Sequence, residues 1–140
     1  MIALDTNILA RAIAIETEAD AATLAQQRHA RALLSSGQDM FVPITVIEEL
    51  EWVLRGIYEM PADEITAVLE DMLAVENLTV DRAAAVAQAV IWYRKGIDFS
   101  DALHLAQAGL CSSMASFDAR FSKTCKRLGL KPPVEIPGGK

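Results

Sequence analysis

Short apolar runs and longer stretches of helical periodicity alternate along the chain. Runs typical of buried strands lie at residues 2–4, 41–42, 78–80, 113–116 and 134–136. Apolar residues recur at helical spacing at 8–13, 19–34, 45–57, 81–95, 102–108 and 118–128, and a further helix begins near Pro61. This alternation predicts an α/β fold in which helices cover a largely parallel sheet.

The helical segment that begins at Thr45 carries the most informative pattern. Thr45 with Glu48 three residues later matches a capping box, which fixes the helical register. In that register the apolar residues form a core stripe of Ile47, Leu50, Leu54 and Ile57. The charged residues of the opposite, solvent side are Glu48, Glu51 and Arg55. Glu49 then lies on the flank between the two faces, where it has no obvious structural task.

The composition is that of a folded domain. Hydrophobic residues make up 52% and charged residues 23% of the 140 residues, which excludes disorder and suits one domain over residues 1–140. No apolar stretch is long enough to span a membrane and no secretory signal is visible, so we expect a cytoplasmic protein. Cys111 and Cys125 are too few and too far apart for a disulfide framework or a zinc cluster, which predicts two buried or half-buried free thiols.

Acidic residues outnumber basic ones. The chain has 19 Asp and Glu against 13 Lys and Arg, a formal net charge of -6. That balance argues against a protein that grips nucleic-acid phosphates through a generally basic surface. Any contact with a polyanion must therefore come from local positive charge.

Four acids fall at junctions between predicted elements. Asp5 follows the first strand, Asp118 follows the run at 113–116, Asp101 lies in the first turn of a helix, and Glu49 lies in the second turn of another. In parallel α/β sheets chemistry gathers at the carboxyl ends of the strands, so these carboxylates are expected at one edge. Converging carboxylates repel one another, and a divalent cation relieves that repulsion. Oxygen ligands favour Mg²⁺ or Mn²⁺ over zinc, and such an ion activates water for attack on a phosphodiester.

Helix capping is the alternative explanation for these positions. Asp5 and Asp118 are suited to be helix N-caps, and Asp98 or Ser100 is suited to cap the helix that follows them. The pattern alone leaves capping and metal binding open for each of these acids. Glu49 is different, because the capping box leaves it without a structural task.

Four segments, in order, resemble the successive motifs of PIN-domain nucleases. They are Asp5-Thr6-Asn7, Glu49-Leu50-Glu51-Trp52-Val53-Leu54, Asp98-Phe99-Ser100-Asp101-Ala102-Leu103 and Ser116-Phe117-Asp118-Ala119-Arg120-Phe121. The closest resemblance is to the VapC toxins of bacterial type II toxin-antitoxin pairs, and it spans residues 1 to about 128. It implies a three-layer α/β/α PIN-like fold, with a mainly parallel central sheet of about four or five strands and a single PIN domain over residues 1–140.

The resemblance also implies roles for individual residues. It assigns metal-binding and catalytic functions to Asp5, Glu49, Asp101 and Asp118. Asp98 is an extra acid that either holds a metal-bound water or only caps its helix, and Asn7 and Ser116 would orient Asp5 and neighbouring waters. Glu49 is chosen over Glu48 because the family's acid precedes a Leu-x-Trp-Val-Leu run at this spacing, and because Glu48 is assigned to capping.

The activity implied is that of a Mg²⁺- or Mn²⁺-dependent endoribonuclease, which hydrolyses RNA phosphodiesters with one or two bound ions. Its role would be that of the toxin of a VapBC-type pair, inhibited by a cognate VapB-type antitoxin and assembled as a homodimer. Arg11 and Arg120 lie near acidic motifs and are the candidate substrate contacts. The candidate dimer face or antitoxin groove comprises the region of Trp52, Ile57 and Tyr58 and the helix around Leu24 and Leu33.

Two other classes of function compete with this interpretation. Phosphatase-like and phospho-acceptor α/β domains also place an Asp after an early strand. Dehalogenase-type phosphatases need a second Asp where the chain has Asn7, and receiver domains need an early acidic pair and a late Lys that are not evident. The other class is a catalytically silent PIN-like binding module, although all four acids are present. Assigning those acids to a metal site leaves 15 acidic against 13 basic residues, so the acidity no longer argues against RNA.

Overall fold

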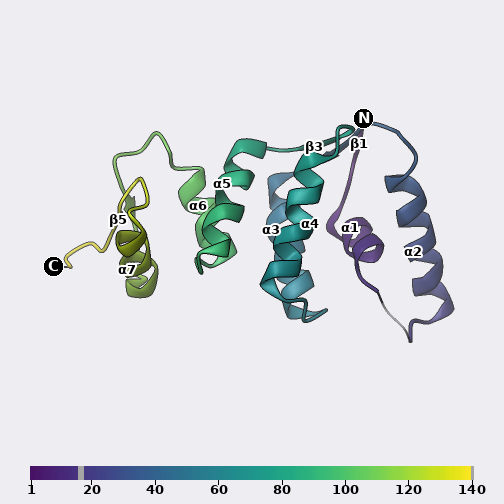
Figure 1. The fold of residues 1–140 in the computed structure, drawn as a ribbon, viewed down its shortest axis with the longest axis horizontal. Coiled ribbons are helices and arrows are strands. Elements are labelled where there is room, and N and C mark those ends of the chain that lie inside the picture. Colours follow the sequence, from purple (N-terminus) through teal and green to yellow (C-terminus); the bar gives the residue numbers. More distant parts are fainter. Residues whose placement is uncertain (16–17, 140) are drawn as a thin grey trace. The chain divides into compact units, whose positions relative to one another are not determined.

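The computed structural model describes residues 1–15 and 18–139. These form two compact units, residues 1–83 and residues 84–140, which we call the N-terminal and the C-terminal unit. Figure 1 shows the order of their helices and strands along the chain. Each unit is described by itself. In the described part of the chain, no helix is long and apolar enough to cross a membrane.

A parallel sheet of three strands forms the base of the N-terminal unit. The strands are β1 (Ile2–Ala3), β2 (Met40–Val42) and β3 (Leu78–Val80), in the order β1-β2-β3. Met40 pairs with Ile2 on one side and with Leu78 on the other. Alternate residues of β3 are buried and exposed, as expected of a strand whose one face packs on a core.

Four helices connect and cover these strands: α1 (Thr6–Ile13), α2 (Ala21–Leu34), α3 (Ile44–Gly56) and α4 (Ala62–Ala74). Helix α1 packs against both α2 and α3, while α4 contacts α3 and β3 (Figure 1). Leu9, Leu50 and Ile65 from three of these helices are fully buried, so apolar burial holds the layer together. Only Leu4 and Asp5 separate β1 from α1, and only Pro43 separates β2 from α3.

The C-terminal unit has three helices and a short pair of strands among its described residues. They are α5 (Ala83–Arg94), α6 (Phe99–Ala106), β4 (Met114–Ala115), α7 (Ala119–Leu128) and β5 (Val134–Glu135), and α5 begins at the last residue of the N-terminal unit. Strands β4 and β5 are parallel, with Met114 opposite Val134. The Tyr93 ring meets the Phe99 ring edge-on, with 5.3 Å between centroids, and joins α5 to α6.

The α/β class with parallel strands is confirmed, and every strand position expected from the sequence is found. The strands pair differently from the single sheet of four or five that we expected. In the described residues three strands form one sheet and β4 pairs with β5 in another. Strands β1, β4 and β5 have 2 residues each, so each offers few hydrogen bonds for further pairing.

The predicted capping box of α3 is wrong. Pro43 is the N-cap residue and makes no side-chain cap bond, so the helix begins one residue before Thr45. The Ile44 N–H instead donates to Asp81 Oδ2 at 3.3 Å, from the segment that follows β3. Glu48 therefore loses the capping role that the local sequence pattern assigned to it.

The predicted faces of α3 also need correction at two positions. Glu51 is only 2% exposed and accepts from Arg55 Nε at 2.8 Å, whereas we expected it on the solvent side. Ile57 lies beyond the helix and is 61% exposed, whereas we expected it in the core. The buried stripe is Ile47, Leu50, Glu51 and Leu54. The arginine partner is what makes an inward-facing carboxylate tolerable there.

Both cysteines are free, as the sequence predicted. Cys125 on α7 is buried, in agreement with the prediction. Cys111 is exposed, so its predicted burial is wrong. It lies in the turn between α6 and β4, where the chain runs over the surface.

Candidate metal centre

Asp5 occupies the junction between β1 and α1. It is exposed, adopts an extended backbone and is the N-cap residue of α1. Its Oδ1 accepts the backbone N–H of Thr6 at 2.7 Å. The Thr6 hydroxyl is buried and makes no hydrogen bond to any other described residue. Asn7 follows as an exposed side chain, so the Asp-Thr-Asn motif presents two polar groups at the surface and one beneath it.

Glu49 is also exposed, on the face of α3 opposite the buried stripe. It shares that face with Trp52, three residues later, which is 57% exposed. Glu48 is half-buried, and the failed capping box no longer separates the two acids. The choice of Glu49 now depends on the family spacing and on its accessibility to a ligand in solvent.

Three carboxylates come from the C-terminal unit. Asp98 is the N-cap residue of α6, where its Oδ2 accepts the N–H of Asp101 at 3.3 Å. Asp118 is the N-cap residue of α7, where its Oδ1 accepts the N–H of Phe121 at 3.0 Å. Asp101 is half-buried in the first turn of α6. Asp5, Asp98 and Asp118 therefore cap helices as expected.

These three carboxylates interact electrostatically. Partial burial raises the pKa of Asp101, and the negative charges of Asp98 and Asp118 raise it further, while His104 opposes the shift. His104 is exposed on the same helix. A carboxyl group held near other carboxylates favours its protonated form until a cation compensates the charge. The negative charges of Asp98 and Asp118 therefore make the ionised form of Asp101 less favourable when no cation is bound.

Ser116 positions the backbone of Asp118. It follows β4 directly, and its Oγ accepts the Asp118 N–H at 3.1 Å. The backbone of Asp118 is thus held by Ser116, and its carboxylate is held by the first turn of α7. The predicted influence of Ser116 and Asn7 on metal-bound water stays a prediction.

The donor chemistry suits a hard divalent cation, because every acid named above offers carboxylate oxygen. Within the described residues, no three side chains of His, Cys, Asp or Glu are close enough together to hold an ion. Asp98, Asp101 and Asp118 belong to the C-terminal unit, and Asp5 and Glu49 belong to the N-terminal unit. A single site that includes the predicted set of four acids therefore stays a prediction.

One comparison with known proteins decides the family. The model of a family described as PIN domain matches residues 2–127. The chain belongs to the PIN-domain family. PIN domains are generally metal-dependent nucleases, so the chain has a nuclease-type fold and is a hydrolase at that coarse level. No curated protein and no solved structure matches it significantly. The PIN match includes all four predicted acids and crosses both compact units.

The two candidate substrate arginines of this PIN domain differ in their surroundings. Arg11 is half-buried and donates from Nε to Gln26 Oε1 at 3.0 Å and from Nη1 to the Tyr58 hydroxyl at 2.7 Å. It therefore ties α1 to α2 and to the turn after α3. Arg120 is exposed in the first turn of α7, two residues after Asp118. Substrate contact stays a prediction for both, and Arg120 has the more accessible guanidinium.

The sequence patterns missed two features of this PIN domain. Asp81 caps α3 across a gap of 37 residues, and the available signal was its place directly after a strand. The exposed lysines and arginine on α7 beyond Arg120 were also missed, although residues 120–131 contain no acid. Both features depend on which residues the fold brings next to Asp81 and next to the cations of α7.

Proposed function

We propose that this PIN domain is a Mg²⁺- or Mn²⁺-dependent endoribonuclease. Asp5, Glu49, Asp101 and Asp118 would hold one or two ions, with Asp98 beside them. The observation that carries the proposal is the family match over residues 2–127, a range that includes all four acids. The raised pKa of Asp101 among Asp98 and Asp118 supports it, because such a cluster gains from binding a cation.

The side chains of this site bind and orient rather than react. Bound metal would activate water and stabilise the negative charge that develops on the phosphodiester. Asp118 is held in place by its helix cap and by Ser116, so little ordering remains when it binds an ion. Asp5 is likewise fixed by its bond to Thr6. No side chain needs to serve as the nucleophile.

The further proposal is that the chain acts as the toxin of a VapBC-type pair. The four motifs resemble those of VapC toxins, and such a toxin would form a homodimer and bind a cognate VapB-type antitoxin. Trp52, Ile57 and Leu24 expose large apolar side chains, which is the usual chemistry of a protein interface. A hollow of about 320 Å³ between α1 and α2, lined in part by Ile8, Leu33 and Arg11, is the proposed antitoxin groove.

Metal-dependent stability tests the chemical core of this proposal. We would melt wild type, Asp118→Asn and Asp20→Asn with and without Mg²⁺ or Mn²⁺. Asp20 is the matched control, because it is the N-cap of α2 and accepts the Thr23 N–H as Asp118 accepts the Phe121 N–H. Asn caps a helix about as well as Asp, so both variants should fold like wild type. Metal at 100 times its Kd should stabilise wild type and Asp20→Asn by about 2.7 kcal/mol, and Asp118→Asn far less.

Cleavage of RNA tests the activity with the same three proteins. Wild type and Asp20→Asn should cut a mixed RNA pool only when Mg²⁺ or Mn²⁺ is present, and Asp118→Asn should not. Metal-dependent stabilisation without cleavage would favour a catalytically silent binding module. An equal melting response in all three proteins would remove Asp118 from the metal site and leave it as a cap.

A further inference from the structure

Charge is divided unequally between the two units. Residues 1–83 hold 15 acidic and 5 basic residues, a net charge of -10, whereas residues 84–140 hold 4 acidic and 8 basic residues, a net charge of +4. Most of the excess in the C-terminal unit lies in one place. Five of the chain's 13 basic residues fall within residues 120–131, which contain no acid: Arg120, Lys123, Lys126, Arg127 and Lys131.

Four of these five cations lie on helix α7, and three of them share one side of it. Phe121 and Cys125 are buried and define its core face. Arg120, Lys123 and Arg127 are exposed and recur at spacings of three and four, which places them on the opposite face. At 1.5 Å per residue this stripe is about 10 Å long. We call the exposed cations of α7 together with Lys131 the basic face.

Among the described residues, the cations of the basic face make no hydrogen bond or ion pair. Arg31 donates to the Ala12 and Ala14 carbonyls at 3.1 and 3.3 Å, and Arg55 pairs with buried Glu51 at 2.8 Å. By contrast, no hydrogen bond or ion pair joins any basic-face side chain to the rest of the chain as the structure describes it. Lys126 and Arg127 in the last turn of α7 favour the helix dipole, but Arg120 at the N-terminal end opposes it, and Lys123 repels both Arg120 and Arg127. The charges of Arg120 and Lys123 are therefore explained better by a ligand than by helix stability.

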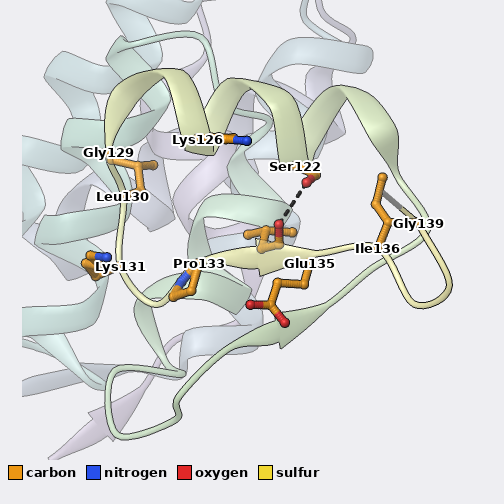
Figure 2. A pocket seen from close by; sticks show the side chains of 10 residues that line it. Ser122, Lys126, Gly129, Leu130, Lys131, Pro133, Glu135, Ile136 and Gly139 are labelled. Carbon is orange, nitrogen blue, oxygen red and sulfur yellow. Dashed lines mark hydrogen bonds between the residues drawn. The ribbon is translucent and has the colours of Figure 1, made fainter.

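A recess lies beside the basic face. Lys126 and Lys131 line a pocket of about 520 Å³ between α7 and residues 129–139 (Figure 2). Its frame is fixed where the Ser122 hydroxyl donates to the Val134 carbonyl at 2.8 Å. Glu135, an acid of the lining, extends from β5 away from α7 in Figure 2. Among the described residues, Glu135 forms no ion pair with Lys126 or Lys131.

We propose that the basic face holds the phosphate backbone of the RNA, an inference that rests on the proposed nuclease function. Evenly spaced cations match a strand of evenly spaced phosphates. A protein partner would need apolar anchors, and among the described residues α7 exposes no large apolar side chain. Asp118, a proposed metal ligand, caps the same helix, so the basic face begins two residues from the proposed chemistry.

Salt-dependent RNA binding tests this inference. The test variant is Lys123→Gln with Arg127→Gln, and the matched control is Arg28→Gln with Lys95→Gln, two exposed cations outside the basic face. Both double variants remove two positive charges, and Gln is a good helix former. Affinity for a labelled, unstructured oligoribonucleotide would be measured across salt concentrations in Ca²⁺, which prefers the same oxygen ligands, and the RNA would be checked for cleavage afterwards.

The test variant should lose about tenfold or more in affinity at low salt, and its log–log salt slope should shrink by about 1.4, or 0.7 per lost contact. The control should follow wild type. Equal losses in both variants would overturn the inference by showing that only total charge matters. If the test variant binds RNA like wild type while wild type still cleaves RNA, the inference fails and the nuclease proposal stands; the basic face would then suit an acidic protein. A wild type that neither binds nor cleaves RNA would overturn both.

Discussion

Asp5 and Asp118 each begin a helix, and each uses only part of its carboxylate to do so. In both residues Oδ1 accepts a backbone N–H, which leaves Oδ2 to bind another partner. A carboxylate has two oxygens and about four lone-pair sites, so one side chain can cap a helix and bind an ion. The two explanations that the sequence pattern left open at these positions are therefore compatible. Capping also orders the carboxylate before any ion arrives.

Two substitutions of Asp118 separate capping from charge. In metal-free protein, Asp118→Ala should lower the free energy of unfolding by about 1 kcal/mol, because the Phe121 N–H loses its acceptor. Asp118→Asn keeps an acceptor and removes a negative charge near Asp101, so its stability should equal or exceed that of wild type. Urea unfolding in EDTA measures both. An Asn variant as unstable as the Ala variant would contradict the separation.

At the scale of elements, the strands and helices were predictable from periodicity because each carries its own apolar pattern. The register of α3 was not, because its N-terminus depends on Asp81, which is 37 residues away. Glu51 shows a different limit, because its partner Arg55 is only four residues away and the local pattern placed both on the solvent side. Local patterns thus locate elements, whereas contacts with the rest of the fold decide where α3 begins and which side of it turns inward.

The contact between Asp81 and α3 can be tested directly. Asp81→Ala should destabilise the protein by about 1 kcal/mol, because the N-terminus of α3 loses both an acceptor and a favourable negative charge. Asp71→Ala is the control, since Asp71 is exposed in the second half of α4, where an acid opposes the helix dipole. Urea midpoints should fall for Asp81→Ala only. Equal midpoints for the two variants would mean that Pro43 alone is enough to start α3.

At the scale of the whole molecule, the net charge does not show how positive and negative residues are distributed between the two units. The value of -6 combines a strongly acidic N-terminal unit with a basic C-terminal unit. The candidate site residues can be listed from the sequence, because the motifs place each acid beside a strand or in a first or second helical turn, and their roles stay predictions. Whether these acids bind metal together is not predictable from the sequence, since Asp5 and Glu49 belong to one unit and Asp101 and Asp118 to the other. Only a measurement of coupling connects the two groups.

Metal binding by single and double variants provides that measurement. If Asp5 and Asp118 serve one ion site, Asp5→Asn and Asp118→Asn should each abolish most Mn²⁺ binding, and the double variant should bind no worse than either. Residues that share a partner depart from additivity by about 0.5–3 kcal/mol, whereas independent residues add. Both Asn variants retain an N-cap acceptor, so the comparison is between folded proteins. Calorimetric titration gives the affinities, and Asp5→Asn combined with Asp20→Asn is the additive reference. Additive losses for Asp5 and Asp118 would show that the two acids do not share an ion, and would remove the basis for a single four-carboxylate site.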